Sequence, residues 1–144
     1  MNLPNGLSYA MAAYRSNSND ENLGDIYNEL INADFIVPLI LPFEAKEGQE
    51  IPLDNSTPIQ FCILKNADGL KYLLLFTTSD KFDDWSTNPN INYTTLGFQH
   101  IVNILKKEED ISGILVDPRD GNMVFERELL FTLEEIDNES GTLN

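Results

Sequence analysis

The sequence predicts an α+β fold in which helices pack on a mixed sheet of about five strands. Three observations lead to this expectation. Two segments near the N-terminus carry apolar residues at helical spacing, several later segments are short and almost continuously apolar, and Asp68-Gly69 between two of them is a strong hairpin signal. A chain of 144 residues, 42% of them apolar, is expected to form one domain around its own core.

The two N-terminal helices are predicted from their apolar stripes. Leu7, Met11 and Tyr14 recur at helical spacing, which predicts a helix over about residues 6–16. A second stripe predicts a helix over about residues 21–33, and the polar residues between the two stripes offer N-caps for it.

Three strands are expected next. Residues 34–41 form an apolar run in which Pro38 cannot donate to a ladder, so we expect an edge or a bend at that point. Residues 58–65 and 70–77 are expected to pair as a hairpin, which should lie centrally in the sheet because it is apolar on both faces. Residues 42–57 are charged and rich in breakers, and they predict an exposed loop.

A short helix is expected after the hairpin. Thr78 or Ser79 can cap it, and Phe82 and Trp85 lie at i and i+3, so their rings should pack inward together. A loop over residues 88–92 is expected to follow this helix.

The longest helix is predicted from Thr94 or Thr95 to about Glu108. Two helices therefore separate residues 70–77 from the strand predicted over residues 111–116, and a connection of that length favours a parallel crossover. A turn is expected over residues 117–121, followed by a hairpin partner over residues 122–125. The chain is then expected to end in a closing helix, with Leu129, Leu130, Leu133 and Ile136, and in a frayed polar tail from about residue 137.

The charge of the chain limits its partners. The formal net charge is −15, from 24 acidic and 9 basic residues, and such a surface repels phosphate backbones and anionic lipids. We therefore expect no nucleic-acid binding and no membrane association. The acidic surface is interpreted as a solubilising coat, with a surface for a basic partner protein as the alternative.

The N-terminus indicates the cellular compartment. It has neither the basic region nor the apolar region of a secretory signal, and the longest apolar stretch, residues 35–43, is too short to span a membrane. One cysteine excludes an internal disulfide framework. These features predict a single domain, residues 1–144, in a reducing cytoplasm.

Few residues suggest chemistry. The sequence has no Gly-rich phosphate loop and none of the common hydrolase, metalloprotease or redox motifs, so we expect no enzymatic activity, cofactor or metal. Cys62 lies mid-strand between apolar residues and is interpreted as a buried structural thiol, not a nucleophile. His100 points away from the apolar stripe of its helix and is interpreted as a surface residue.

Residues 117–122 resemble a calcium loop in part, but Arg119 occupies a ligand position and a hairpin turn explains them better.

Two acidic clusters stand at ends of predicted helices. Residues 108–110 lie at a helix C-terminus, where the dipole disfavours negative charge, and are interpreted as solvated surface. Asp83 and Asp84 precede Trp85, the single tryptophan of the chain. Tryptophan is common in binding hot spots, although a single one on a short helix is usually core. We therefore take Asp83, Asp84 and Trp85 as candidate interaction residues, with core packing as the alternative for Trp85.

Several blocks of the sequence follow one another in a recognisable order. They are the paired N-terminal helices, a strand ending in Val37-Pro38, the Asp68-Gly69 turn, residues 75–79 (Leu-Phe-Thr-Thr-Ser), Trp85, a long helix and residues 113–118 (Gly-Ile-Leu-Val-Asp-Pro). Over about residues 7–130 this order resembles the SseB (enhanced serine sensitivity) family, N-terminal-domain type. The family usually has Asn before the last proline, where this chain has Asp117.

The resemblance implies a cytosolic bacterial α+β module and carries over no catalytic residues. We therefore expect a non-enzymatic protein-interaction or regulatory module whose partner is another protein, basic in character. Two alternatives stay open. One is a small-molecule sensor or enzyme linked to amino-acid (serine) metabolism, and the other is an immunity-type protein that neutralises a basic toxin. The sequence does not indicate an oligomeric state.

Overall fold

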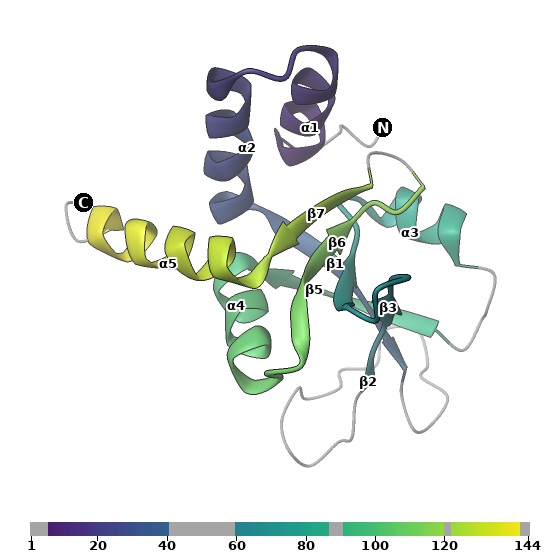
Figure 1. The fold of residues 1–144 in the computed structure, drawn as a ribbon. Helices are drawn as coiled ribbons and strands as arrows, with labels where there is room; N and C mark the ends of the chain where they lie inside the picture. The colour runs from purple at the N-terminus through teal and green to yellow at the C-terminus, as the bar shows by residue number, and fades with distance from the viewer. Residues whose placement is uncertain (1–5, 41–59, 87–90, 120–121, 142–144) are drawn as a thin grey trace.

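The computed structural model describes residues 6–40, 60–86, 91–119 and 122–141 (Figure 1). Within these residues the chain forms five helices and seven strands. In chain order they are α1 (Gly6–Ser16), α2 (Asp20–Asn32), β1 (Asp34–Ile40), β2 (Gln60–Phe61), β3 (Ile63–Lys65), β4 (Lys71–Leu75), α3 (Ser79–Trp85), β5 (Ile91–Gly97), α4 (Phe98–Lys107), β6 (Ile111–Val116), β7 (Met123–Glu126) and α5 (Arg127–Gly141). The α+β class and the two N-terminal helices are confirmed. The loop predicted over residues 42–57 lies outside the described residues.

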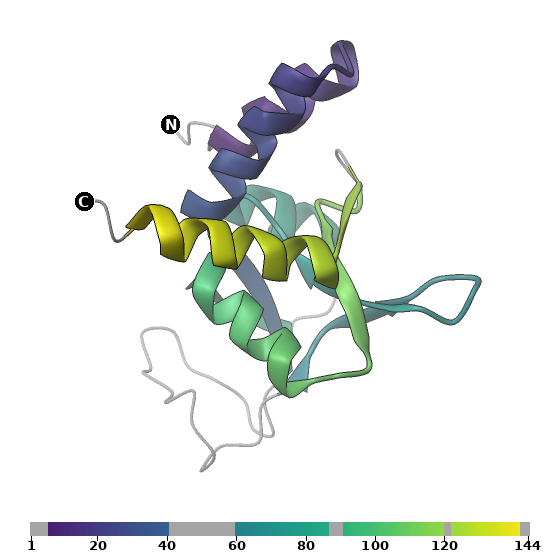
Figure 2. The ribbon, with the colours of Figure 1, turned by 60° about the vertical axis from the view of Figure 1, so that its left-hand side comes forward.

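The strands form two sheets and not the single mixed sheet expected. One is antiparallel in the order β2-β1-β5, and the other has the order β3-β4-β6-β7. Strands β4 and β6 are parallel, as the long connection between them predicts. The division arises at Cys62, where one predicted strand splits into β2, which pairs with β1, and β3, which pairs with β4. Strand β4 is internal as predicted, but β3 lies at an edge, and their hairpin projects from the body (Figure 2).

The position of Pro38 corrects the expectation of an edge strand, because β1 lies between β2 and β5. On the β2 side, Ile36 exchanges both backbone hydrogen bonds with Phe76, and the β2 ladder begins only at Leu39. Backbone groups alternate in direction along a strand, so the nitrogen of Pro38 faces the same side as that of Ile36. The missing N–H therefore falls where β1 changes from one neighbour to the next.

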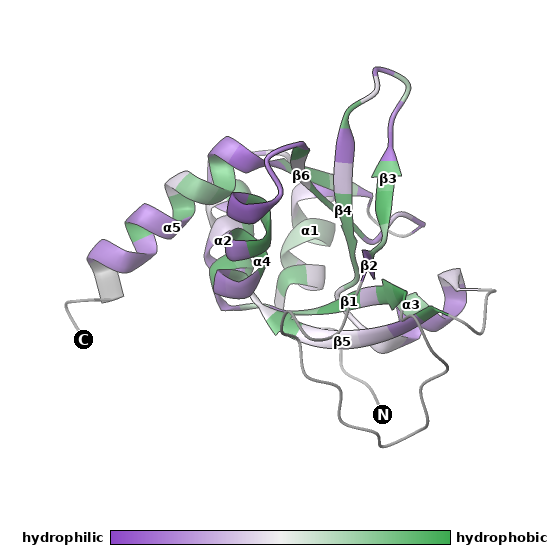
Figure 3. Ribbon diagram, turned by 90° about the horizontal axis from the view of Figure 1, so that it is seen from below, coloured by the Kyte–Doolittle hydropathy of each residue, from purple (hydrophilic) through white to green (hydrophobic). Residues whose placement is uncertain are grey.

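Strand β5 includes residues 91–92 of a predicted loop and the start of a predicted helix; residues 88–90 of that loop lie outside the described residues. The sequence predicts a loop over residues 88–92 and a helix from Thr94 or Thr95, but β5 spans Ile91–Gly97 and α4 begins at Phe98. All 7 residues of β5 pair with β1 in unbroken register. The middle of β5 is aromatic and β-branched, which suits a strand, although it is more polar than β1 (Figure 3). Pairing with β1, which is distant in the sequence, therefore determines that residues 91–97 form a strand.

Both faces of the second sheet pack against other elements. Successive side chains of a strand point to opposite faces. Leu73 and Leu75 of β4 face the main core, to which α1, α2, α4 and α5 all contribute. Leu74 faces the opposite side of the sheet, where it forms a second hydrophobic cluster with Phe76, which follows β4, and with Phe82 of α3. The candidate site lies beside this second cluster.

An arginine lies at the end of α4, beside the acidic residues 108–110. The Arg127 guanidinium donates to the backbone carbonyls of Leu105 at 2.9 Å, Glu109 at 2.9 Å and Ile111 at 2.7 Å. The Leu105 carbonyl is one that the end of α4 leaves unpaired, and the guanidinium brings positive charge to the negative end of the helix dipole. The acidic residues 108–110, unfavourable by themselves at a helix C-terminus, thus have a cation beside them.

The closing helix is longer than predicted. Helix α5 spans Arg127–Gly141 and continues through residue 137, where the sequence predicts a frayed tail; its C-terminal end projects from the body (Figure 2). Leu130 and Leu133 are buried. Ile136 is 50% exposed, because residues 135–139 extend beyond the core and are all exposed.

Glu134 joins α4 to α5. Glu134 is 7% exposed. Its carboxylate lies 2.7 Å from Lys106 Nζ and also accepts a hydrogen bond from the Gln99 side-chain amide. The hydrogen bond from Lys106, and then that from Gln99, lower the pKa of Glu134 below the ordinary glutamate value. A carboxylate with a lowered pKa stabilises the folded state above the pKa of the unfolded chain. This contribution is lost as the pH falls through the folded-state pKa.

We predict that Glu134→Gln lowers the free energy of unfolding at pH 7 by about 1 kcal/mol, and that its difference from the wild type shrinks as the pH falls from about 5 to about 3. Urea titrations at several pH values measure this dependence. Glu135→Gln, at the exposed neighbouring position, is the control and should change little. A difference that stays constant down to the lowest pH would show that Glu134 acts through packing and not through its charge.

Candidate functional site

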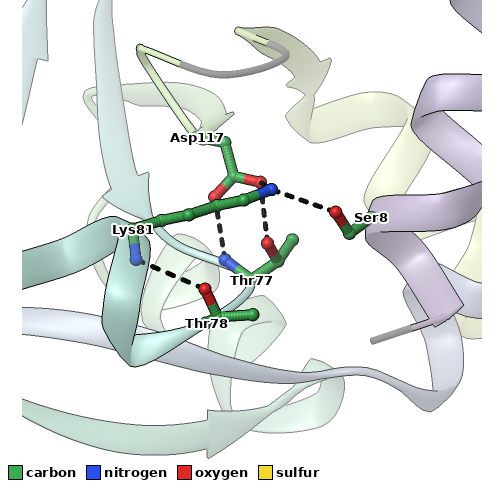
Figure 4. A network of polar contacts seen from close by, with 5 residues as sticks. All are labelled: Ser8, Thr77, Thr78, Lys81 and Asp117. Carbon is green, nitrogen blue, oxygen red and sulfur yellow. Dashed lines mark hydrogen bonds and ion pairs between the residues drawn. The ribbon is translucent and has the colours of Figure 1, made fainter. Parts of the chain in front are cut away.

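A buried polar network lies where the ends of β4 and β6 meet α3 and α1 (Figure 4). Asp117 Oδ1 accepts a hydrogen bond from the Thr77 backbone N–H at 2.9 Å, and Oδ2 accepts one from the Thr77 hydroxyl at 2.8 Å. Lys81 Nζ lies 3.1 Å from Oδ2 and donates to Ser8 Oγ at 3.0 Å. The Asp117 side chain is 0% exposed and that of Lys81 is 23% exposed, so this ion pair is largely buried. We call Ser8, Thr77, Thr78, Lys81 and Asp117 the Asp117 network.

The chain positions these groups by turning at two strand ends. After β4, the Thr78 hydroxyl caps α3 by accepting the Lys81 backbone N–H at 3.3 Å, which sets Lys81 in the first turn of the helix. After β6, Asp117 adopts a left-handed conformation with φ 53°, which Asp and Asn tolerate better than most residues. Its backbone N–H donates to the Leu75 carbonyl at 3.0 Å, while its side chain turns toward Thr77.

The groups of the Asp117 network bind one another. Both carboxylate oxygens have donors, and every buried side-chain polar atom in the described part of the chain has a hydrogen-bond partner. A hollow of about 70 Å³ lies against the network, lined by Phe76, Lys81, Asp84, Asp117 and Arg119. Pockets for drug-sized ligands measure about 300–1,000 Å³. This hollow therefore has room for one side chain or a few waters, and the network serves as structural support.

An aromatic cluster lies beside the network. The ring centroids of Phe76 and Trp85 are 5.4 Å apart, those of Phe76 and Phe82 are 5.8 Å apart, and those of Phe82 and Tyr93 are 5.0 Å apart. Aromatic pairs at such separations stabilise each other beyond simple burial. Phe76 and Phe82 are buried, Trp85 is half-buried and Tyr93 is 45% exposed. The cluster thus begins in the core and ends at the surface.

The predicted interaction residues lie together at the end of α3. Asp83 and Asp84 are exposed, and Trp85 packs against the second cluster while remaining partly exposed. Arg119 donates to the backbone carbonyl of Asp84 at 2.9 Å, which ties the turn after β6 to this end of the helix. Trp85 therefore combines the two positions that the sequence offers as alternatives, one side in the core and one side at the surface.

The other two reactive side chains lie on different elements. Cys62 stands between β2 and β3 and is half-buried, which corrects the prediction of a buried thiol. It packs against the second cluster, and burial raises the pKa of its thiol, which disfavours the thiolate that a nucleophile needs. His100 lies on α4 and is exposed, as predicted.

The segment that resembles a calcium loop begins with a carboxylate already engaged within the protein. Asp117 accepts hydrogen bonds from Thr77 and Lys81, and residues 120–121 lie outside the described residues. In the ranges that the structure describes, no three His, Cys, Asp or Glu side chains come together in a way that could hold a metal ion.

The pairing of Lys81 with Asp117 is not evident from the sequence, because 36 residues separate the two. One signal was present, namely an aspartate directly before a proline at the end of a buried strand. Short polar side chains at such positions often bind nearby backbone groups. This signal marks Asp117 as a structural residue, but it does not name Thr77 or Lys81 as its partners.

Comparison with known proteins agrees with the resemblance. The family model described as the SseB protein N-terminal domain matches residues 7–132, which is most of the chain. No curated protein and no solved structure gives a significant match. The matched range contains the whole Asp117 network and the aromatic cluster.

We predict that Lys81→Met lowers the free energy of unfolding by about 3 kcal/mol, because it leaves a buried carboxylate without its counter-ion. Asp117→Asn should cost about 1 kcal/mol, because the amide oxygen can still accept the Thr77 N–H and Asn tolerates the left-handed conformation. Urea unfolding of both variants measures the difference. Lys107→Met, at an exposed lysine of α4, is the control. A cost for Lys81→Met no larger than that for Lys107→Met would show that the ion pair with Asp117 does not stabilise the fold.

We predict that Cys62→Ala keeps the fold and that the native thiol reacts slowly with a thiol reagent at pH 7. The reason is its raised pKa, which leaves little thiolate in the folded protein. Labelling rates in the native and the guanidinium-unfolded states give the comparison, and the native rate should increase with pH. Native labelling as fast as that of the unfolded chain would contradict a structural role.

Proposed function

We propose that this chain, which belongs to the SseB protein N-terminal domain family, is a non-enzymatic protein-interaction or regulatory module of the bacterial cytosol. The arrangement of α3 carries the proposal. Polar groups at the start of the helix bind one another, while its end presents Asp83, Asp84 and Trp85 at the surface. A tryptophan held by core packing and flanked by exposed charge suits recognition, because such aromatic anchors dominate binding energy at interfaces.

The chemistry of the Asp117 network supports a binding module over an enzyme. A general base or nucleophile must reach its substrate. The Asp117 side chain is 0% exposed and is held by Thr77 and Lys81, so its role in folding accounts for its environment. The adjoining hollow of about 70 Å³ is smaller than an amino acid or nucleotide requires, which also disfavours a sensor of serine metabolism at this site.

The proposed partner is a basic protein. With a formal net charge of −15, the chain attracts basic surfaces and accelerates their association, whereas phosphate backbones are repelled. Attraction between exposed charges is screened over about 8–10 Å at physiological ionic strength. In the described part of the chain, no helix is long and apolar enough to cross a membrane.

We predict that the immobilised chain captures a specific basic protein from a lysate of its own bacterium, and that association slows as salt rises from about 50 to about 500 mM. Mass spectrometry identifies the partner and surface plasmon resonance measures its association rate. Replacing Asp83 and Asp84 with Asn should slow association more than Glu135→Gln with Asp137→Asn, which removes the same charge from exposed positions of α5.

Two outcomes would count against this function. Failure to capture any specific partner across several growth conditions would remove the support for an interaction module. A thermal shift produced by an amino acid or nucleotide at millimolar concentration would favour the sensor instead, because a ligand that binds the folded state must stabilise it.

A further inference from the structure

The second face of the sheets is less completely covered than the main core. On the main-core side, Leu73 and Leu75 of β4 are 0% exposed. On the second face, Val124 of β7 and Tyr93 of β5 are each 45% exposed, and Leu115 of β6 is partly buried. Of the described helices, α3 is the one whose side chains enter the second cluster, whereas four helices contribute to the main core. Apolar surface of β5 and β7 therefore remains open to solvent on this second face.

Strand register and packing place these apolar side chains on the strand faces that turn toward the second cluster. Leu115 packs against the second cluster, and Val124 lies directly opposite it on β7, so the two share a face. Ile91 packs against the same cluster, and Tyr93, two residues further along β5, shares its face and contacts Phe82. We call Cys62, Leu64, Ile91, Tyr93, Leu115 and Val124 the open face.

Acidic side chains stand at both ends of the open face. At the α3 end, Asp83 and Asp84 are exposed. At the other end, Glu126 of β7 accepts a hydrogen bond from the Tyr72 hydroxyl at 3.1 Å. Burial raises the pKa of Tyr72, and the hydrogen bond to Glu126 and the negative charge of Glu126 raise it further. An extended apolar surface with an acidic rim is the result.

We propose that the open face is the docking surface for a basic segment of a partner protein. Apolar side chains of that segment cover Val124, Leu115 and Tyr93, and its Lys or Arg side chains meet the acidic residues at the two ends. Charge complementarity selects this occupant, because a second copy of the chain carries the same net charge of −15 and would bring acidic side chains against acidic side chains. The inference rests on the proposed function and adds to it the surface and the chemistry of the bound segment.

Three synthetic peptides of equal length test this chemistry. One alternates Leu and Lys, the second Ser and Lys, and the third Leu and Glu. Trp85 fluorescence and backbone amide chemical shifts report binding, since Trp85 is the single tryptophan and packs against the second cluster. The Leu/Lys peptide should bind with shifts confined to α3 and the open-face strands, and the other two at least about tenfold more weakly. Absence of Leu/Lys binding, shifts centred on α1 or α5, or equal binding of the Ser/Lys peptide would overturn the proposal.

Matched substitutions test the location. Val124→Ser and Tyr93→Ser remove apolar surface from the open face. The controls are Ile136→Ser on α5 and Tyr9→Ser on α1, which remove apolar surface at positions that are 50% and 63% exposed. The first pair should each weaken binding of the Leu/Lys peptide about fivefold and the second pair less than about twofold. Equal effects from both pairs would contradict the proposed surface. Melting temperatures verify folding, and the chemical-shift map of the wild type decides the location if a variant fails to fold.

The same variants separate this inference from the proposed function. A lysate partner that binds the wild type, Val124→Ser and Tyr93→Ser equally well would overturn the docking surface while leaving the interaction module in place. A partner whose binding falls in these two variants and not in Ile136→Ser or Tyr9→Ser would support both. Capture of no specific partner would overturn both.

Discussion

The buried ion pair between Asp117 and Lys81 holds four elements in one arrangement. A carboxylate without solvent contact is costly unless it is paired and hydrogen-bonded, and here Thr77 supplies two donors while Lys81 supplies the charge. These contacts fix the ends of the parallel strands β4 and β6 against the first turn of α3, and Lys81 extends the connection to Ser8 of α1. The direction of α3, and with it the position of every residue at its far end, depends on this point.

Strand β4 imposes a second constraint, because it is apolar on both faces. Its alternating side chains require cover on two sides, and the chain provides this unequally. Four helices contribute to one side, while α3 and the β2-β1-β5 sheet provide the cover of the other. Tyr93 of β5 and Val124 of β7 remain 45% exposed on this less covered side, so the open face follows from the same packing that builds the second cluster.

The charged residues divide between folding and surface roles. Arg127 binds backbone carbonyls at the end of α4, and Glu134 joins α4 to α5 through Lys106 and Gln99. Together with the Asp117 network, these contacts engage Asp117 and Glu134, the buried carboxylates of the described residues. Asp83 and Asp84 remain at the surface beside a half-buried tryptophan. Internal ion pairs therefore set the geometry of the elements that carry these exposed residues.

Local sequence patterns determined α1, α2, α3, the Asp68-Gly69 hairpin and the parallel relation of β4 and β6, because capping residues, helical spacing and connection length act over short distances. They also indicated Asp83, Asp84 and Trp85 as one group. Tertiary structure alone decided strand β5, the division into two sheets at Cys62 and the ion pair of the Asp117 network. Each of these features depends on contacts between residues far apart in the chain. The free energy that stabilises them comes from these distant contacts, which the neighbouring residues in the sequence do not indicate.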